Sequence, residues 1–154
     1  MTYSQAYEPF AENPLFVDSN NMQSPIDGTV PREMIPYQLK KTKRDRIRAG
    51  ELLNNPIEVS PEIIKKGKEL FVLICQQCHG EIGDGQGKLF IDKLYPYPPA
   101  SLISDKLKAA PDGEIFHVIS VGYNLMGTYA SILTQEERWM VVHYIRELQN
   151  QEVK

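Results

Sequence analysis

The pattern of apolar and polar positions changes near residue 60 of the 154-residue chain. Ser60, Pro61 and Glu62 form a typical helix start, with a capping hydroxyl, a proline at the first helical position and an acid in the first turn. Apolar or small residues then recur on one helical face, at Ile63, Gly67, Leu70, Phe71 and Ile74. This pattern predicts a helix that runs from residue 60 into a cysteine-containing motif at 75–79.

Further helices are predicted in the second half of the chain. A glycine-rich loop follows the cysteine motif, and a short helix is expected near residues 88–94, before a proline-rich stretch stops it. Pro111 begins a helix that runs to about Val121 and ends at Gly122. Thr134 and Glu137 form a capping-box pattern, which begins a final helix to about residue 149. No strand pattern competes, so the fold class is predicted to be all-α.

The first 59 residues show no comparable periodicity. Six of the eleven prolines lie there, and each removes a backbone donor and biases its predecessor away from helix. We therefore expect an extended arm over residues 1–59 and an all-α domain over 60–154 that folds without the arm. Such an arm buries little surface by itself, so we expect it to lie across partner subunits and to become ordered by contact with them.

Charge is distributed unevenly along the chain. The net charge is −3, which argues against nucleic-acid binding by bulk charge. Residues 32–50 carry seven bases and two acids, a local net of +5. The basic stretch at 40–48 is either a solvated segment or a docking site for an acidic subunit or anionic headgroups. No apolar run approaches the roughly 18 residues of a membrane span.

The motif Cys75-Gln-Gln-Cys78-His79 is the attachment signal for c-type haem. The two thiols add to the two vinyl groups of haem, and the adjacent histidine binds the iron. The competing interpretations are weaker, because a structural zinc site normally needs four ligands and a thioredoxin-like pair needs a βαβ context. A chance occurrence would leave two reactive thiols beside a glycine-rich loop. We therefore predict one covalently bound haem c.

The iron needs a sixth ligand or an open site. Met126 is the preferred candidate, because it lies in a glycine-bounded loop and follows His79 by 126 − 79 = 47 residues, enough to reach the other face of the ring. Its alternative role is a loop methionine that covers the core. The other candidates are Met22, Met34, Met140, His117 and His143.

These residues resemble those of class I cytochrome c. The resemblance covers residues 60–150 and includes the haem motif, the glycine-rich loop, Met126 and an aromatic final helix. It implies that the first and last helices cross tightly, with Gly67 allowing the close approach to Tyr144. It also implies an electron-transfer protein rather than an enzyme, with one-electron transfer through iron bound by His79 and Met126.

In related cytochromes a proline carbonyl in the loop after the attachment site accepts the other ring proton of the histidine. The resemblance therefore implies Pro98 or Pro99 in that role. Tyr95, Tyr97 and Trp139 are candidates for bonding the haem propionates, and their alternative role is that of core aromatics.

A narrower resemblance uses the rest of the chain. The segments at 7–9, 25–32, 55–56, 107–122 and 126–130 are similar to the monohaem cytochrome c subunit of alternative complex III, a bacterial membrane complex that oxidises quinol. This resemblance implies membrane-complex partners, including a multihaem or iron–sulfur subunit, and a downstream oxidase or soluble cytochrome. That subunit is usually a lipoprotein, and no N-terminal cysteine precedes Met1.

Haem c is attached outside the bacterial cytoplasm, so we expect a periplasmic protein. The chain opens with neither a basic start nor an apolar stretch, which leads us to expect an upstream export signal that has been removed. The hypotheses are a fixed subunit of a respiratory complex, a free soluble shuttle, and a haem enzyme or gas sensor in which Met126 is not a ligand.

Overall fold

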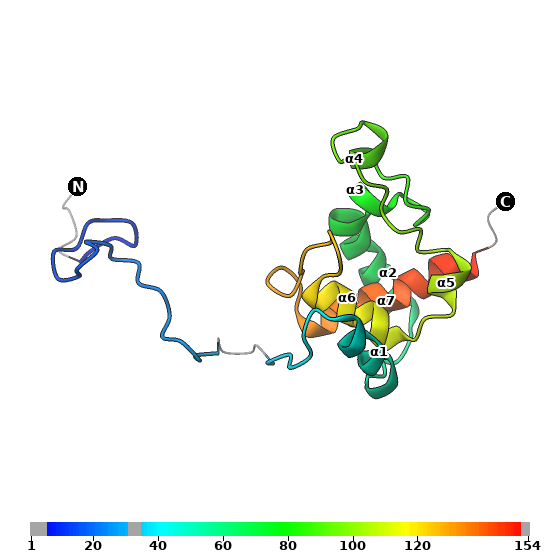
Figure 1. Ribbon diagram of the computed structural model, residues 1–154, viewed down its shortest axis with the longest axis horizontal. Coiled ribbons are helices and arrows are strands. Elements are labelled where there is room, and N and C mark those ends of the chain that lie inside the picture. The colour runs from blue at the N-terminus through cyan, green and yellow to red at the C-terminus, as the bar shows by residue number, and fades with distance from the viewer. Residues whose placement is uncertain (1–5, 31–34, 152–154) are drawn as a thin grey trace. The chain divides into compact units, whose positions relative to one another are not determined.

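The computed structural model describes residues 6–30 and 35–151, which fall into two compact units. The first unit ends at residue 34 and the second begins at Ile35. The second unit contains α-helices, which are labelled in Figure 1, and a π-helix. These are α1 (Lys43–Leu52), α2 (Pro61–Leu70), the π-helix η1 (Phe71–Cys75), α3 (Gln76–His79), α4 (Lys88–Ile91), α5 (Asp105–Lys108), α6 (Asp112–Val121) and α7 (Gln135–Asn150).

The all-α prediction is confirmed for the described residues, where pairing between extended segments is limited to isolated bridges. The predicted helix starts are also present. The hydroxyl of Ser60 accepts a hydrogen bond from the Ile63 amide at 3.3 Å. At the start of α7 the Glu137 amide donates to the Thr134 hydroxyl at 3.2 Å, and the Thr134 amide donates to the Glu137 carboxylate at 2.9 Å. Local sequence therefore determines where α2 and α7 begin.

The second unit is built around the crossing of α2 and α7. A Cβ atom at Gly67 would collide with the backbone carbonyl of Met140, so only glycine allows this approach. One turn further on, the rings of Phe71 and Tyr144 meet edge to face with centroids 5.3 Å apart. The core continues to α6, where the rings of Phe116 and Trp139 stack at 3.9 Å. The expected crossing of the first and last helices of the domain is thus present.

The expectation of an irregular segment up to residue 59 is wrong for residues 43–52. Thr42 caps α1 by accepting a hydrogen bond from the Asp45 amide at 3.0 Å. Ala49 is fully buried against α6, where Gly113 allows the backbones to touch. The side-chain amide of Asn55 also donates to the backbone carbonyl of Trp139 at 3.1 Å. The segment from Ile35 to residue 59 therefore packs as part of the second unit rather than as an arm.

The first unit is a loop held by polar side chains. Asn13 is 4% exposed, donates to the Asn21 side chain at 2.8 Å and accepts from the Leu15 amide at 3.0 Å. Asn21 in turn donates to the carbonyl of Glu8 at 2.9 Å. The exposed fraction is high for the apolar side chains of this unit, namely Phe10 (88%), Leu15 (80%), Val17 (109%) and Ile26 (81%). The polar side chain of Asn13 is therefore buried in this unit, while several large apolar side chains are exposed.

No helix among the described residues has the length and apolar character needed to cross a bilayer.

Replacing Gly67 with Leu is expected to destabilise the second unit, because the new side chain would force α2 away from α7. Overpacking of this kind typically costs about 1–3 kcal/mol. Thermal unfolding followed by circular dichroism measures the loss. Gly28→Ala is a control in the first unit: its φ of +86° strains an alanine locally, but a Cβ would meet nothing within 4 Å, and the melting of the second unit should stay unchanged.

Removing residues 1–34 is expected to leave the second unit folded, whereas removing residues 1–55 is expected to destabilise it. The longer deletion takes away α1, the buried Ala49 and the Asn55 hydrogen bond. We expect the longer deletion alone to lower the melting temperature by more than about 5 °C, since 1 kcal/mol corresponds to several degrees in a domain of this size. Equal melting temperatures for the two truncations would contradict the packing role of α1.

Candidate functional site

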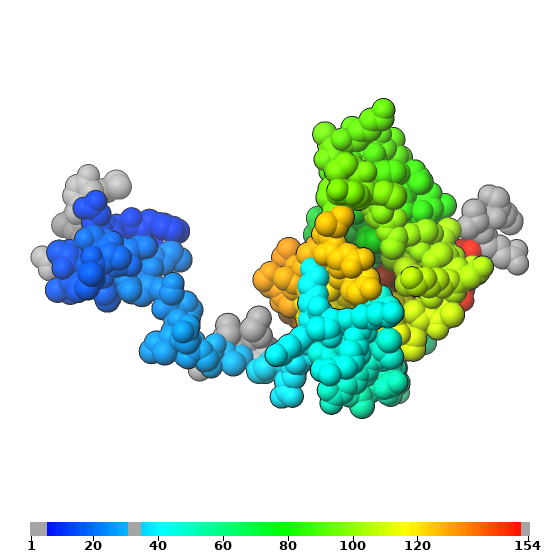
Figure 2. Space-filling view, in the orientation of Figure 1, coloured from blue at the N-terminus to red at the C-terminus, as the bar shows by residue number. Residues whose placement is uncertain are grey.

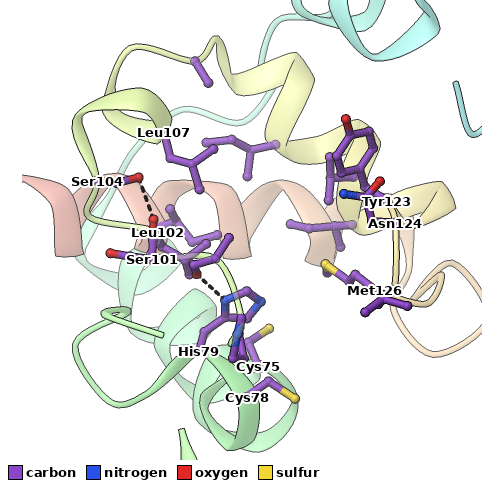
Figure 3. Close-up of a pocket in the computed structure, with 18 of the residues that line it drawn as sticks. Cys75, Cys78, His79, Ser101, Leu102, Ser104, Leu107, Tyr123, Asn124 and Met126 are labelled. Atoms are coloured by element: carbon purple, nitrogen blue, oxygen red, sulfur yellow. Dashed lines mark hydrogen bonds between the residues drawn. The ribbon is translucent and has the colours of Figure 1, made fainter. Parts of the chain in front are cut away.

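A cavity of about 790 Å³ opens between the cysteine motif and the loop that carries Met126. Its walls come from η1 and α3, from the loop at 95–107, from α6 and α7, and from the loop at 123–129. Apolar side chains such as Phe71, Leu102 and Ile119 make up much of the lining. Figure 3 shows Cys75, Cys78 and His79 on one side of this space and Met126 on another.

The cysteine motif begins at the end of the π-helix η1 and continues into α3. A π-helical turn widens the backbone and is frequent at functional sites. Both cysteines are free and both line the cavity. Burial, together with the neighbouring Cys78, raises the pKa of Cys75 to about 12, so this thiol is protonated at neutral pH.

The zinc interpretation finds no support from the geometry. In the described ranges, no group of three or more His, Cys, Asp or Glu side chains is arranged to hold a metal ion. The two cysteines and His79 therefore lack the further ligands of a structural zinc site.

The glycine-rich loop folds back onto the motif. The amide of Gly85 donates to the carbonyl of His79 at 2.8 Å, and that of Gly87 donates to the carbonyl of Cys78 at 3.1 Å. A Cβ at Gly87 would collide with the Cys78 carbonyl. These contacts hold the end of α3 in place, so the motif has a defined orientation toward the cavity.

His79 is oriented by a hydrogen bond to the opposite loop. Its Nδ1 lies 3.0 Å from the carbonyl oxygen of Ala100, which can only accept, so Nδ1 carries the proton and Nε2 is left unprotonated. Burial lowers the pKa of His79, and the Ala100 carbonyl opposes this shift. The neutral ring therefore offers a lone pair suitable for binding a metal. The expectation that Pro98 or Pro99 supplies this carbonyl is wrong: both prolines line the cavity, and the acceptor is the residue that follows them.

Met126 ends a tight turn that follows α6. Gly122 adopts a φ of +79° and Asn124 a φ of +47°, and both values belong to the left-handed region. The amides of Tyr123 and Met126 donate to each other's carbonyls at 3.2 and 2.9 Å. This turn places the partly buried Met126 side chain in the cavity wall.

The other ligand candidates are engaged elsewhere or lie away from the cavity. Nδ1 of His117 lies 2.9 Å from the Tyr37 hydroxyl, and Nε2 of His143 lies 2.8 Å from the Ile57 carbonyl. Met140 belongs to α7 at its crossing with Gly67 and does not line the cavity. Met22 belongs to the first unit. Met34 lies outside the described residues, as do Pro31 and Arg32 of the narrower resemblance.

The three aromatic candidates separate into two groups. Tyr95 and Tyr97 line the cavity, and their rings meet at 6.2 Å. Trp139 is 3% exposed, stacks on Phe116 and is absent from the lining, which matches its alternative role as a core aromatic.

The sequence did not reveal which basic side chains line the cavity. Among the lining residues, the basic side chains are Arg46 from α1 and Lys106 from α5. Arg46 forms an ion pair with Glu114 at 3.2 Å, and its guanidinium lies 4.5 Å from the centre of the Tyr123 ring. The segregated charge at 32–50 was the signal available in the sequence, but it did not indicate that α1 reaches the cavity.

Comparison with known proteins identifies the family. The family model described as cytochrome c oxidase, cbb3-type, subunit III matches residues 62–145, more than half of the chain. The chain belongs to this class I cytochrome c family. Membership implies electron transfer through covalently bound haem c, and the motif at Cys75–His79 fits that attachment.

Comparison with solved structures gives information on the fold and not on the function. A chain of the reducing HAO-like protein complex of Kuenenia stuttgartiensis superposes on the cytochrome with a TM-score of 0.53 at 24% sequence identity. The match covers 62% of this cytochrome and 49% of that chain, so the cytochrome spans about half of its structural neighbour. No curated protein matches the sequence.

Proposed function

We propose that this cytochrome carries single electrons through one haem c bound by Cys75, Cys78, His79 and Met126, as a subunit of a quinol-oxidising membrane complex of the alternative complex III type. The cavity supports the proposal of electron transfer, because the attachment motif lies in one wall and Met126 lies in another. When bound, the haem supplies an Fe(II)/Fe(III) couple whose potential depends on the axial ligands and their surroundings.

The residues of the cavity fit that cofactor. Cys75 and Cys78 would form the thioethers, and both are free. His79 presents an unprotonated Nε2 because the Ala100 carbonyl holds its Nδ1 proton. The apolar lining would exclude water from the macrocycle.

With His79 and Met126 both as ligands, no position at the iron is left for a substrate, which favours electron transfer over catalysis. A methionine–histidine pair also raises the reduction potential.

The polar lining would serve the haem carboxylates. Arg46 and Lys106 are the basic lining residues, and Tyr97 contributes a hydroxyl from the loop that also holds Ala100. Hydrogen bonds between a cationic side chain and a carboxylate are shorter and stronger than those between neutral groups.

The first unit supports the proposal of a fixed subunit. Its Asn13 and Asn21 side chains organise the loop, while large apolar side chains remain exposed. Large exposed apolar side chains are typical of protein or membrane interaction sites when they lie together on a surface. Together with the resemblance of segments at 7–9 and 25–32, these exposed side chains are proposed to dock on neighbouring subunits at the periplasmic face of the bacterial inner membrane, after export.

Replacing Met126 with Ala is expected to open the sixth position, allow carbon monoxide binding and lower the reduction potential. We expect a shift well above about 59 mV, the change that alters a one-electron equilibrium tenfold. Absorbance spectra and a redox titration of the haem-loaded protein measure both effects. Met140→Leu is the matched control and should leave the spectrum unchanged, because Met140 lies outside the cavity lining. An unchanged spectrum in the Met126 variant would eliminate it as ligand and favour the sensor or enzyme hypothesis.

Replacing Phe10, Leu15 and Val17 together with Ser is expected to abolish co-purification with other haem subunits from solubilised membranes. The haem spectrum should stay unchanged, because the second unit holds the cavity. The control Phe10→Leu, Leu15→Met and Val17→Ile keeps the apolar surface and should retain the complex. Recovery of both variants as free monomers from membranes that hold the other subunits would instead support the soluble shuttle.

A further inference from the structure

We propose that Lys41 is a positioning residue for the sixth ligand, and that the segment Lys40–Arg46 acts as a clamp on the loop that carries Met126. This inference rests on the proposed function of Met126 as an iron ligand. The clamp lies before residue 62, where the match to the cytochrome family begins. It therefore assigns a role at the redox site to a part of the chain outside the matched domain.

Lys41 contacts the loop through its ammonium group. Nζ lies 3.1 Å from the carbonyl oxygen of Asn124 and 3.3 Å from that of Met126. The Met126 carbonyl also accepts the Tyr123 amide at 3.2 Å, so the same oxygen joins the turn to the lysine. Hydrogen bonds from a charged donor are stronger than those between neutral groups. In Figure 2 the cyan segment lies directly against the orange loop, as these contacts require.

Hydrogen bonds on both sides of Lys41 fix the backbone from which its side chain projects. The carboxylate of Asp45, which is 5% exposed, accepts the Lys40 amide at 3.0 Å, and this hydrogen bond lowers the pKa of Asp45. The Thr42 amide donates to the Lys40 carbonyl at 2.7 Å. Lys41 thus projects from a closed turn, so less conformational entropy is lost when its side chain binds the loop.

Arg46 makes a second contact with the same loop. Its guanidinium stacks over the Tyr123 ring at 4.5 Å and pairs with Glu114 of α6 at 3.2 Å. Tyr123 begins the turn and Met126 ends it. Arg46 therefore contacts the first residue of the turn, and Lys41 contacts the last. Both bases belong to a segment whose helix is anchored on α6 through Ala49 and Gly113.

The Lys41 contacts would determine how often Met126 leaves the iron. The turn at 123–126 is otherwise closed by its own backbone bonds, and Leu125 at its tip is 62% exposed. After the turn, Thr128 and Tyr129 donate to carbonyls of Ser120 and Ile119 in α6 at 2.6 and 3.0 Å. Opening the loop breaks the Lys41 contacts, so their presence raises the free energy of the opened state. Removing them should leave the closed structure intact and increase the population in which the sixth position is exposed.

The test is cyanide binding to the ferric, haem-loaded full chain, because cyanide reaches the iron only after Met126 leaves. We expect Lys41→Gln to bind cyanide about three- to tenfold faster and tighter than the original protein, the range for losing exposed charge-assisted hydrogen bonds. Lys41→Arg should restore slow binding, since it keeps a charged donor. Lys43→Gln is the matched control: it removes the same charge two residues away, has no recorded contact with the loop, and should bind as the original does.

A second readout tests the loop directly. In the ferrous protein, amide hydrogen exchange at Met126, whose N–H is bonded within the turn, should be several-fold faster in Lys41→Gln. Thermal melts of all variants verify that the fold is retained. Cyanide binding and exchange equal to the original in Lys41→Gln would overturn the clamp, and so would an equal effect of Lys43→Gln, which would indicate a general charge effect. Failure of the ligand assignment is distinguishable, because it would appear in the spectrum of the Met126→Ala variant.

Discussion

The close contact of α2 and α7 at Gly67 determines the geometry of the redox site. α2 leads without interruption into η1 and α3, so its position on α7 sets where Cys75 and His79 stand. α7 also packs on α6 through Trp139 and Phe116, and α6 ends at the turn that carries Met126. The separation of the two walls of the cavity therefore depends on one helix crossing, which a single side chain at Gly67 would widen.

Much of the second unit could be predicted from sequence because its signals are local. The Ser60 cap, the Thr134 capping box and the glycine that ends α6 each act within a few residues. The Cys75–His79 motif identified the cofactor site for the same reason. Met126 lines the cavity as expected, and its role as a ligand remains a prediction.

The errors arose where tertiary contacts decide the outcome. α1 has charged residues at most positions and shows no apolar stripe, so its stability comes from Ala49 against α6 and from the capping by Thr42. The acceptor for His79 is Ala100 rather than a proline, and the nearby Leu102 amide donates to the Gly83 carbonyl at 2.6 Å, which fixes this segment on the glycine-rich loop. The resemblance indicated which loop supplies the carbonyl. Which residue of that loop supplies it depends on how the chain folds.

The protonated state of Cys75 bears on the order of events during maturation. Burial raises the pKa of Cys75 to about 12, so its thiol is protonated at neutral pH. The thiolate is the form that attacks disulfides, so the protonated state of Cys75 slows thiol–disulfide exchange at this sulfur. The same protonation makes Cys75 a poor nucleophile toward a vinyl group. Attachment of the haem at Cys75 is therefore favoured before the helices pack around this thiol. The helices would then close around a thioether that has already formed.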